Sequence, residues 1–392
     1  MEAGDESVIH GINNTTRCLT PLGGDEGAEA HVWAVGTCSP ATAANAVHLV
    51  HYVPENGTTG VETAYTVPDG AEVWRLASHP GHAHLLAAVV RDAGEPGATG
   101  RGLVYSMSDL PAFGAGDGDG DAALQLPSPT SPSALPQLEQ TGSLPGGPGT
   151  ELGPVVDVLI SALDVTDSSA AVVCRRGVAL ATLDRDGLAA AVARYVLPSD
   201  GNGATCGARS PHASDEVAVA IGSRIVGYDV RAQSEAFVLE GAAAQGGAGI
   251  FSLDFNPNKL YCLASGHSDG SVAFWDVRKG GEPVVRMHEH AHWVWGLAYN
   301  HSYDQFVLSG SSDTLVKLYS VWSASSAWEA SEAGRAGHPV DHVAKTYEEH
   351  DDSVYGLAWS RGDAWTFASV SGDGRVAIHA VPQEAKMQAL MT

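Results

Sequence analysis

An internal repeat in the C-terminal third of the chain constrains its fold more strongly than any other feature. The residues from His290 to Tyr299 align without a gap with His350 to Trp359, and Leu308 to Asp313 aligns with Ala368 to Asp373 at the same offset of sixty residues. A third copy runs from Leu263 to Asp276, and its Asp269 precedes Asp313 by 44 residues. Copies spaced by about 40–45 residues are units of a modular fold, in which each copy packs on its neighbours.

Glycine and proline punctuate the whole chain, and the segments between them have the pattern of short β-strands. The 46 Gly and 20 Pro leave few windows long enough for an amphipathic helix. Segments such as Val47 to Val53 and Glu216 to Ala220 are rich in β-branched residues and alternate in polarity. The third repeat copy ends in the dipeptide Trp275-Asp276, which is typical of WD repeats. The sequence therefore predicts an all-β fold, a WD-repeat β-propeller.

We expect a seven-bladed propeller over residues 7–382. The best-marked blades span 241–286, 287–345 and 346–382. Weaker matches upstream supply four more blades, around Ile221 to Arg231, Val158 to Asp186, Ala71 to Met107 and Ala30 to Val53. The opening segment from Val8 to Ile12 is then left to complete the sheet of the last blade, which removes the free edge that a ring must close.

Two stretches interrupt the strand pattern. From 112 to 154 the chain is dominated by Gly, Asp, Ser and Pro, which cannot offset their ordering entropy, so we expect a disordered low-complexity insertion there. A shorter stretch at 323–341 is rich in Ala, Ser and Gly and is expected to loop out of one blade. Neither stretch is interpreted as a domain boundary.

The repeat carries polar residues at fixed spacings, and these form the predicted structural site. A His before the first strand, a Ser on the second, an Asp in the next turn and a Trp on the third can meet in one buried hydrogen-bonded chain. Each copy holds three of the four members, with Gly246, Tyr319 and His379 at the missing positions. The predicted members are Ser265, Asp269 and Trp275; His290, Ser309 and Asp313; and His350, Ser369 and Asp373.

The charge balance excludes several classes of partner. With 21 basic and 46 acidic residues the net charge is −25 and no basic patch is evident, so neither nucleic acid nor an anionic membrane is an expected partner. The longest apolar runs are strand-sized, and the acidic start lacks a signal-peptide pattern. Five scattered cysteines without a Cys-x-x-Cys pair suit reduced thiols, so a cytoplasmic location is expected.

Four strings in the last third of the chain resemble one WD-repeat family. They run from Leu253 to Lys259, His290 to Trp295, Tyr299 to Gln305 and Tyr347 to Tyr355. They resemble the proteins that interact with the endosome-associated recycling protein (EARP) complex, and the resemblance is strong over about residues 250–381. It implies a non-catalytic adaptor that binds subunits of the EARP and Golgi-associated retrograde protein (GARP) tethering complexes. The implied location is peripheral, at endosomes and the trans-Golgi network, in endosomal recycling and retrograde transport, with membrane association only indirect.

A second interpretation stays open for the end of one blade. The segment from Leu263 to Arg278 also fits the pattern by which some WD-repeat proteins bind the adaptor of a cullin-RING ubiquitin ligase as substrate receptors. In that case Asp276 and Arg278 are the partner-binding residues, and Arg278 forms a bidentate ion pair with a partner carboxylate. In the alternative interpretation these residues only end a blade, with Arg278 solvated or paired with Asp276.

The remaining candidates for chemistry are weak, and we expect no enzyme, metal site or cofactor. His288, His290 and His292 would share one face of a strand, but His290 already belongs to a polar set. The run from Gly116 to Asp121 imitates half of a calcium loop and lacks the closing Glu. No G-x-G-x-x-G string follows a strand and opens a helix.

An aromatic run in the last two repeat copies has two interpretations. Its members are Trp293, Trp295, Tyr299, Tyr355, Trp359 and Trp365. Trp and Tyr dominate protein-binding hot spots, which favours an interface. Strand alternation instead puts Trp293 and Trp295 on one face, where neighbouring blades pack, which favours the core. Exposure at the rim of the ring would distinguish the interface from the core.

Overall fold

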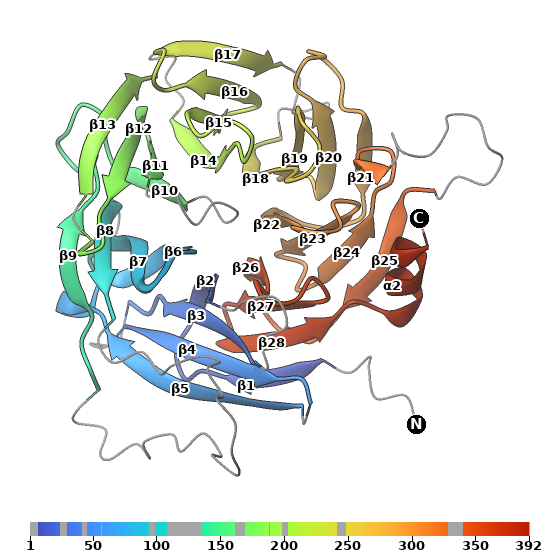
Figure 1. Cartoon of the computed structure of the whole chain (residues 1–392), viewed down its shortest axis with the longest axis horizontal. Coiled ribbons are helices and arrows are strands. Elements are labelled where there is room, and N and C mark those ends of the chain that lie inside the picture. Colours follow the sequence, from blue (N-terminus) through green and yellow to red (C-terminus); the bar gives the residue numbers. More distant parts are fainter. Residues whose placement is uncertain are drawn as a thin grey trace.

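A computed structural model shows the chain as a closed ring of β-sheets (Figure 1). The structure describes residues 7–23, 30–40, 45–55, 57–93, 99–107, 135–160, 169–187, 189–197, 203–240, 248–327 and 340–391. Within these ranges, seven four-stranded antiparallel sheets follow one another around the ring. The predicted seven-bladed β-propeller is therefore confirmed.

The first four blades use consecutive strands, with the first strand nearest the centre. Blade 1 consists of β2 (Thr16–Leu22), β3 (His31–Thr37), β4 (Ala46–Val53) and β5 (Thr58–Thr66). Blade 2 consists of β6 (Glu72–His79), β7 (His82–Arg91), β8 (Arg101–Ser106) and β9 (Glu139–Ser143). Blade 3 consists of β10 (Val155–Ile160), β11 (Ser169–Cys174), β12 (Gly177–Leu183) and β13 (Ala189–Val196). Blade 4 consists of β14 (Ala204–Arg209), β15 (Glu216–Ile221), β16 (Arg224–Asp229) and β17 (Ser234–Leu239).

The last three blades contain the sequence repeat. Blade 5 consists of β18 (Ile250–Phe255), β19 (Cys262–His267), β20 (Ser271–Asp276) and β21 (Val285–His288). Blade 6 consists of β22 (Val294–Tyr299), β23 (Phe306–Ser311), β24 (Val316–Ser320) and β25 (His342–Tyr347). Blade 7 consists of β26 (Val354–Trp359), β27 (Thr366–Ser371), β28 (Arg375–Ala380) and β1 (Val8–Gly11). A short 3-10 helix, η1 (Pro68–Gly70), precedes β6, and helix α2 (Gln383–Leu390) follows β28.

The strands differ in burial according to their position in the blade. The middle strands β19, β23 and β27 are buried along their whole length, because neighbouring blades cover both of their faces. The outer strands β9 and β17 are largely exposed. The core is accordingly a ring of seven apolar clusters, one between each pair of neighbouring blades.

The ring closes through the N-terminal strand, as predicted. Strand β1 pairs with β28, with Val8 opposite Ile378 and Gly11 opposite Arg375. The next residue, Ile12, donates its backbone N–H to the carbonyl of Gly374 at 2.7 Å and joins the apolar cluster between blades 7 and 1. The segment from Val8 to Ile12 therefore leaves no unpaired edge on β28.

Other boundary predictions need correction. The prediction that residues 112–154 are disordered is wrong for residues 135–154. Strand β9 lies in this part, pairs with β8 and supplies the fourth strand of blade 2. Residues 112–134 lie outside the described residues. The predicted borders at 286/287 and 345/346 fall inside β21 and β25. The stretch 323–341 lies between β24 and β25, and its residues 328–339 lie outside the described ranges. Helix α2 was not predicted; its Ala385 and Ala389 pack into the cluster between blades 6 and 7.

Candidate functional site

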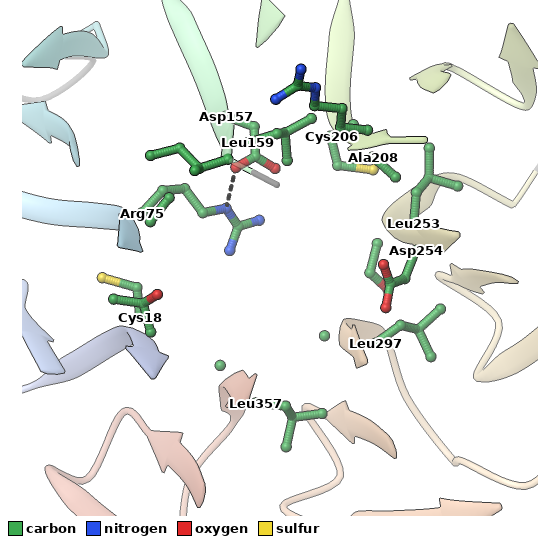
Figure 2. A pocket seen from close by; sticks show the side chains of 18 of the residues that line it. Cys18, Arg75, Asp157, Leu159, Cys206, Ala208, Leu253, Asp254, Leu297 and Leu357 are labelled. Carbon is green, nitrogen blue, oxygen red and sulfur yellow. Dashed lines mark ion pairs between the residues drawn. The ribbon is translucent and has the colours of Figure 1, made fainter. Parts of the chain in front are cut away.

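The first strands of the seven blades line a channel through the middle of the ring. The channel has a volume of about 400 Å³ and draws lining residues from all seven of these strands. Figure 2 shows its charged side chains among leucines, alanines and cysteines. The guanidinium of Arg75 on β6 lies 3.7 Å from a carboxylate oxygen of Asp157 on β10.

Asp254 on β18 is a second buried carboxyl in the channel. Its Oδ2 accepts the backbone N–H of Tyr299 at 2.7 Å. Burial raises the pKa of Asp254 from its ordinary 3.8 to about 7, against the lowering effect of the backbone hydrogen bonds of Tyr299 and Phe255. Burial also raises the pKa of Asp157, although Arg75 opposes the shift.

Blade 6 joins its three predicted polar residues in one chain. His290 Nε2 lies 2.6 Å from Ser309 Oγ, and His290 Nδ1 lies 2.9 Å from Asp313 Oδ2. Burial alone would raise the pKa of Asp313, but the hydrogen bonds from His290 and from the backbone of Ala291 outweigh it and lower the pKa to about 2. Tyr319 stands at the position predicted for Trp, opposite Val307 in the strand register.

Blade 7 has a chain of different composition from the predicted one. Ser369 Oγ lies 2.7 Å from His350 Nε2 and 2.8 Å from His379 Nε2, and His379 Nδ1 lies 2.8 Å from the hydroxyl of Ser7. Asp373 does not complete this chain: its carboxylate accepts backbone N–H groups of Asp351 and Arg375, and no described group bonds His350 Nδ1. The prediction is therefore correct for His350 and Ser369 and wrong for Asp373, whose carboxylate is satisfied by the turn.

Blade 5 replaces its missing histidine from another position. Trp275 Nε1 donates to Ser265 Oγ at 2.7 Å, and Ser265 Oγ also lies 2.8 Å from Nε2 of His267 on the same strand. Gly246, at the predicted His position, lies outside the described residues. Asp269 is not part of this chain, since it accepts the backbone N–H and the hydroxyl of Ser271 at 2.9 and 2.7 Å. Sequence reasoning missed His267, because no other copy has a histidine at that register.

Asp276 and Arg278 bond to each other. Arg278 Nε and Nη2 donate to the two carboxylate oxygens of Asp276 at 2.9 and 2.7 Å, and the guanidinium lies over the ring of Tyr261. The hydrogen bond from Arg278 lowers the pKa of Asp276. The carboxylate of Asp276 thus already occupies the side of the Arg278 guanidinium that a carboxylate of a ligase adaptor would bind.

Among the described residues, the other candidates form no recognised chemical site. In the described part of the chain, His, Cys, Asp and Glu side chains form no group of three or more that could hold a metal ion. The run from Gly116 to Asp121 lies outside that part. The string from Gly266 to Gly270 has G-x-S-x-G spacing, but it joins strands β19 and β20, and its Ser268 Oγ accepts the N–H of Gly249 at 2.9 Å.

A β-bulge occupies the same position in the first strand of every blade. In each of these strands one extra residue stands between two residues that pair with the second strand. In blade order from 1 to 7, the extra residues are Arg17, Trp74, Val156, Thr205, Phe251, Trp295 and Tyr355.

Five of these extra residues touch one another in sequence around one mouth of the channel. Ring centroids are 4.8 Å apart for Phe251 and Trp295 and 5.7 Å apart for Trp295 and Tyr355. The Arg17 guanidinium then lies 4.4 Å from the centre of the Tyr355 ring and 3.8 Å from that of Trp74. We call the five residues Phe251, Trp295, Tyr355, Arg17 and Trp74 the bulge arc.

The predicted aromatic run is divided between the core and this arc. Tyr299 and Trp359 are buried, each 6% exposed, and Trp365 stacks on Tyr303 away from the mouth. Trp295 and Tyr355 belong to the bulge arc and are half-buried. Trp293 is 42% exposed and extends the arc, with its ring 5.4 Å from that of Phe251. The core interpretation is therefore correct for Tyr299 and Trp359, and the interface interpretation stays a prediction for Trp293, Trp295 and Tyr355.

No helix formed by the described residues is both long and apolar enough to cross a bilayer.

Comparisons with known proteins place the chain among characterised relatives. A family model described as EIPR1 beta-propeller matches residues 166–319, and a model of the WD domain, G-beta repeat, matches residues 342–379. The chain is 32% identical over 410 residues to EARP and GARP complex-interacting protein 1 of Rattus norvegicus, with 99% of both chains covered. It is 31% identical over 411 residues to the EARP-interacting protein homolog of Gekko japonicus, again with 99% of both covered. WD repeat-containing protein DWA2 of Arabidopsis thaliana is 27% identical over 383 residues, covering 97% of this chain and 98% of the relative.

Proposed function

The chain belongs to the family of EARP and GARP complex-interacting proteins, and from that premise we propose that it is a non-catalytic adaptor that binds EARP/GARP-type vesicle-tethering complexes. The observation that carries the proposal is the alignment over 99% of both chains with relatives whose names state this interaction. Because the alignment spans the whole ring, it covers every blade and not one repeat.

The architecture supports a role in binding. A closed propeller offers rigid surfaces built from loops and strand ends, and such scaffolds position contact residues without moving themselves. The net charge of −25 opposes direct attachment to anionic lipid, so the proposed location at endosomes and the trans-Golgi network depends on the tethering partner. In this role the protein takes part in endosomal recycling and endosome-to-trans-Golgi retrograde transport.

The experiment is affinity purification of the tagged full-length chain, followed by mass spectrometry. We expect tether subunits to be recovered in stoichiometric amounts, and equally with Arg278→Ala, because the side chain of Arg278 is used within its own blade. Recovery of a cullin-RING ligase adaptor without tether subunits, abolished by Arg278→Ala, would contradict the proposal and favour a substrate receptor. Recovery of neither would also contradict it.

A further inference from the structure

The fold does not require the side chains of the bulge arc. In blades 3 and 4 the same bulge position holds Val156 and Thr205, and these blades form the same four-stranded sheets. An aromatic or arginine side chain is therefore not needed to make the bulge. The arc instead collects the residue types that dominate protein-binding hot spots, Trp, Tyr and Arg, at a mouth where they remain half-buried.

Two arginines stack on the same tryptophan at one end of the arc. The guanidinium carbons of Arg17 and Arg91 lie 3.8 and 3.5 Å from the centre of the Trp74 ring. Two guanidinium groups this close to one ring centre overlap unless they lie on opposite faces, so Trp74 is held between them. With Tyr355 on the other side of Arg17, aromatic rings and cations alternate in a stack of four side chains.

Within the described part of the chain, no carboxylate forms a hydrogen bond or an ion pair with either arginine. Arg17 makes ring contacts and no hydrogen bond or ion pair there, and the Nε of Arg91 is buried without a hydrogen-bond partner. Burial lowers the pKa of Arg17, and the neighbouring cations Arg75 and Arg91 lower it further. Glu72, which stands opposite Arg91 in the strand register, raises the pKa of Arg91 against the lowering effect of burial, and its carboxylate also accepts the indole N–H of Trp74 at 3.0 Å. A bound anion would relieve the repulsion among these three guanidinium groups.

The rest of the molecule limits the kind of anion. A net charge of −25 repels extended polyanions such as nucleic acid or an anionic bilayer, because these bring many charges within the Debye length of about 8–10 Å of the acidic surface. A chain segment with one or two carboxylates among apolar side chains meets mainly the local field of the arginines. Its apolar side chains can cover Trp295, Phe251 and the exposed Trp293 at the other end of the arc.

We propose that the bulge arc, with Arg91 and Trp293 at its two ends, is a docking site for an extended partner segment in which an acidic residue stands beside aromatic or aliphatic residues. The acidic side chain binds the edges of Arg17 and Arg91, and the apolar side chains pack along Trp295, Phe251 and Trp293. The inference deepens the proposed function and rests on it in taking the ligand to be part of a protein.

The test begins with a displayed library of random dodecapeptides selected on the purified full-length protein. We expect enriched sequences in which Asp or Glu lies next to aromatic or aliphatic residues. An enriched peptide and its amide analogue, with Glu→Gln or Asp→Asn, are then titrated against wild type and Arg17→Gln by fluorescence anisotropy. The amide peptide should bind wild type at least about tenfold more weakly than the acid peptide does, and Arg17→Gln should bind the acid peptide more weakly by a similar factor. The amide peptide and Arg17→Gln together should show little further loss of affinity, because both changes remove the same contact.

Matched variants separate docking from folding. Arg231→Gln removes an exposed arginine of blade 4, which pairs with Asp215, and should leave peptide affinity unchanged. Trp293→Ala removes an exposed ring and should weaken peptide binding about tenfold with an unchanged unfolding midpoint. It therefore tests the arc even if Arg17→Gln fails to fold.

Three results would overturn the inference. The first is that the selected peptides contain no acidic residues. The second is that Arg17→Gln lowers the affinity for the acid peptide and the amide peptide by the same factor. The third is that the protein binds phosphatidylserine vesicles and no peptide. The two proposals fail separately. If wild type recovers tether subunits but no peptide couples to Arg17, the docking site fails and the adaptor function stands. If acidic peptides couple to Arg17 and no tether subunit is recovered, the adaptor function fails and the docking site stands.

Discussion

At the scale of single residues, the buried hydroxyl of Ser309 is the strongest test of the polar chain in blade 6. Ser309→Ala leaves His290 Nε2 without its partner at 2.6 Å, and an orphaned buried polar atom costs about 1–3 kcal/mol. We expect that loss in the free energy of unfolding by urea. Ser320→Ala is the matched control, because the buried Ser320 hydroxyl has no partner among the described residues. Equal losses for the two variants would refute a special role for the chain.

The second residue-scale prediction concerns pH and Asp254. Its pKa is about 7 in the folded protein against an ordinary 3.8, so the folded state holds the proton more tightly. The resulting stabilisation is complete below about pH 4 and is lost as the pH rises through 7. Asp254→Asn removes this titration while its side-chain oxygen can still accept the N–H of Tyr299. We expect the variant to be more stable than wild type by about 1–2 kcal/mol at pH 8, less than the full pKa difference implies, because the effective dielectric constant around buried charges in proteins is about 20.

The measurement is urea unfolding of both proteins at pH 5 and pH 8. Asp186→Asn, at an exposed turn, serves as the control and should keep the pH dependence of wild type. If wild type and Asp254→Asn lose equal stability between the two pH values, the assignment of the titration to Asp254 is wrong.

A recurring spacing predicted the members of the polar chain fully in blade 6 and only in part in blades 5 and 7, where Asp269 and Asp373 bond within their turns. The chain of His290, Ser309 and Asp313 follows from such a spacing, and the structure joins these residues. His267 and Ser7 take part in blades 5 and 7 from positions that no other copy marks. Arg17 could not be assigned to a site, because Trp74 and Tyr355 reach it only when the ring brings blades 2 and 7 to either side of blade 1.

At the scale of elements, the turn between β23 and β24 departs from its equivalents. Thr314 has a φ of 72°, whereas the corresponding turns of blades 5 and 7 have Gly270 and Gly374 at φ of 86° and 82°. A β-branched residue in this region is strained by roughly 1–2 kcal/mol. Thr314→Gly should therefore raise the free energy of unfolding by up to about 1 kcal/mol, after the larger chain entropy of glycine is subtracted.

The comparison is with Thr314→Ala, which keeps a Cβ at positive φ and should gain much less. Both variants are measured by thermal and urea unfolding. A glycine variant no more stable than the alanine variant would show that the turn stores little strain.

The sequence predicted correctly that the elements are β-strands, but it predicted less well where the strands begin and end. The strands of blades 5 to 7 carry the repeat, but their fourth strands β21 and β25 carry no marker residue, so the predicted borders cut through them. β9 has the sequence Glu-Gln-Thr-Gly-Ser, which has low intrinsic strand preference, and it forms because β8 offers an edge for pairing. The bulges were not predictable, because one extra residue in a strand leaves no trace in composition.

At the scale of the whole molecule, closure depends on a short segment at the start of the chain. Ile12 is 8% exposed and packs between blades 7 and 1, whereas the nearby Ile9 is 48% exposed. Ile12→Ala should lower the free energy of unfolding by about 2–4 kcal/mol, and Ile9→Ala by less than about 0.5 kcal/mol. Weakened closure also uncovers the edge of β28, so Ile12→Ala should associate at high concentration in sedimentation velocity experiments. Similar stability of the two variants would contradict this account.

The global fold was predictable because it is the sum of repeated local units. Seven units and a leftover N-terminal strand followed from spacing and punctuation alone, and the structure has this arrangement. The composition of each mouth of the channel was not predictable, since it depends on which side chains the bulges of different blades present to one another.

The pairing of β1 with β28 has a consequence for biosynthesis. The ribosome makes Val8 long before Ile378, and the two are paired in the finished protein. Six blades can complete their own sheets as they emerge, but the seventh must wait until β28 has been made. During that interval β1 has no partner strand, and its pairing with another exposed edge would delay closure of the ring.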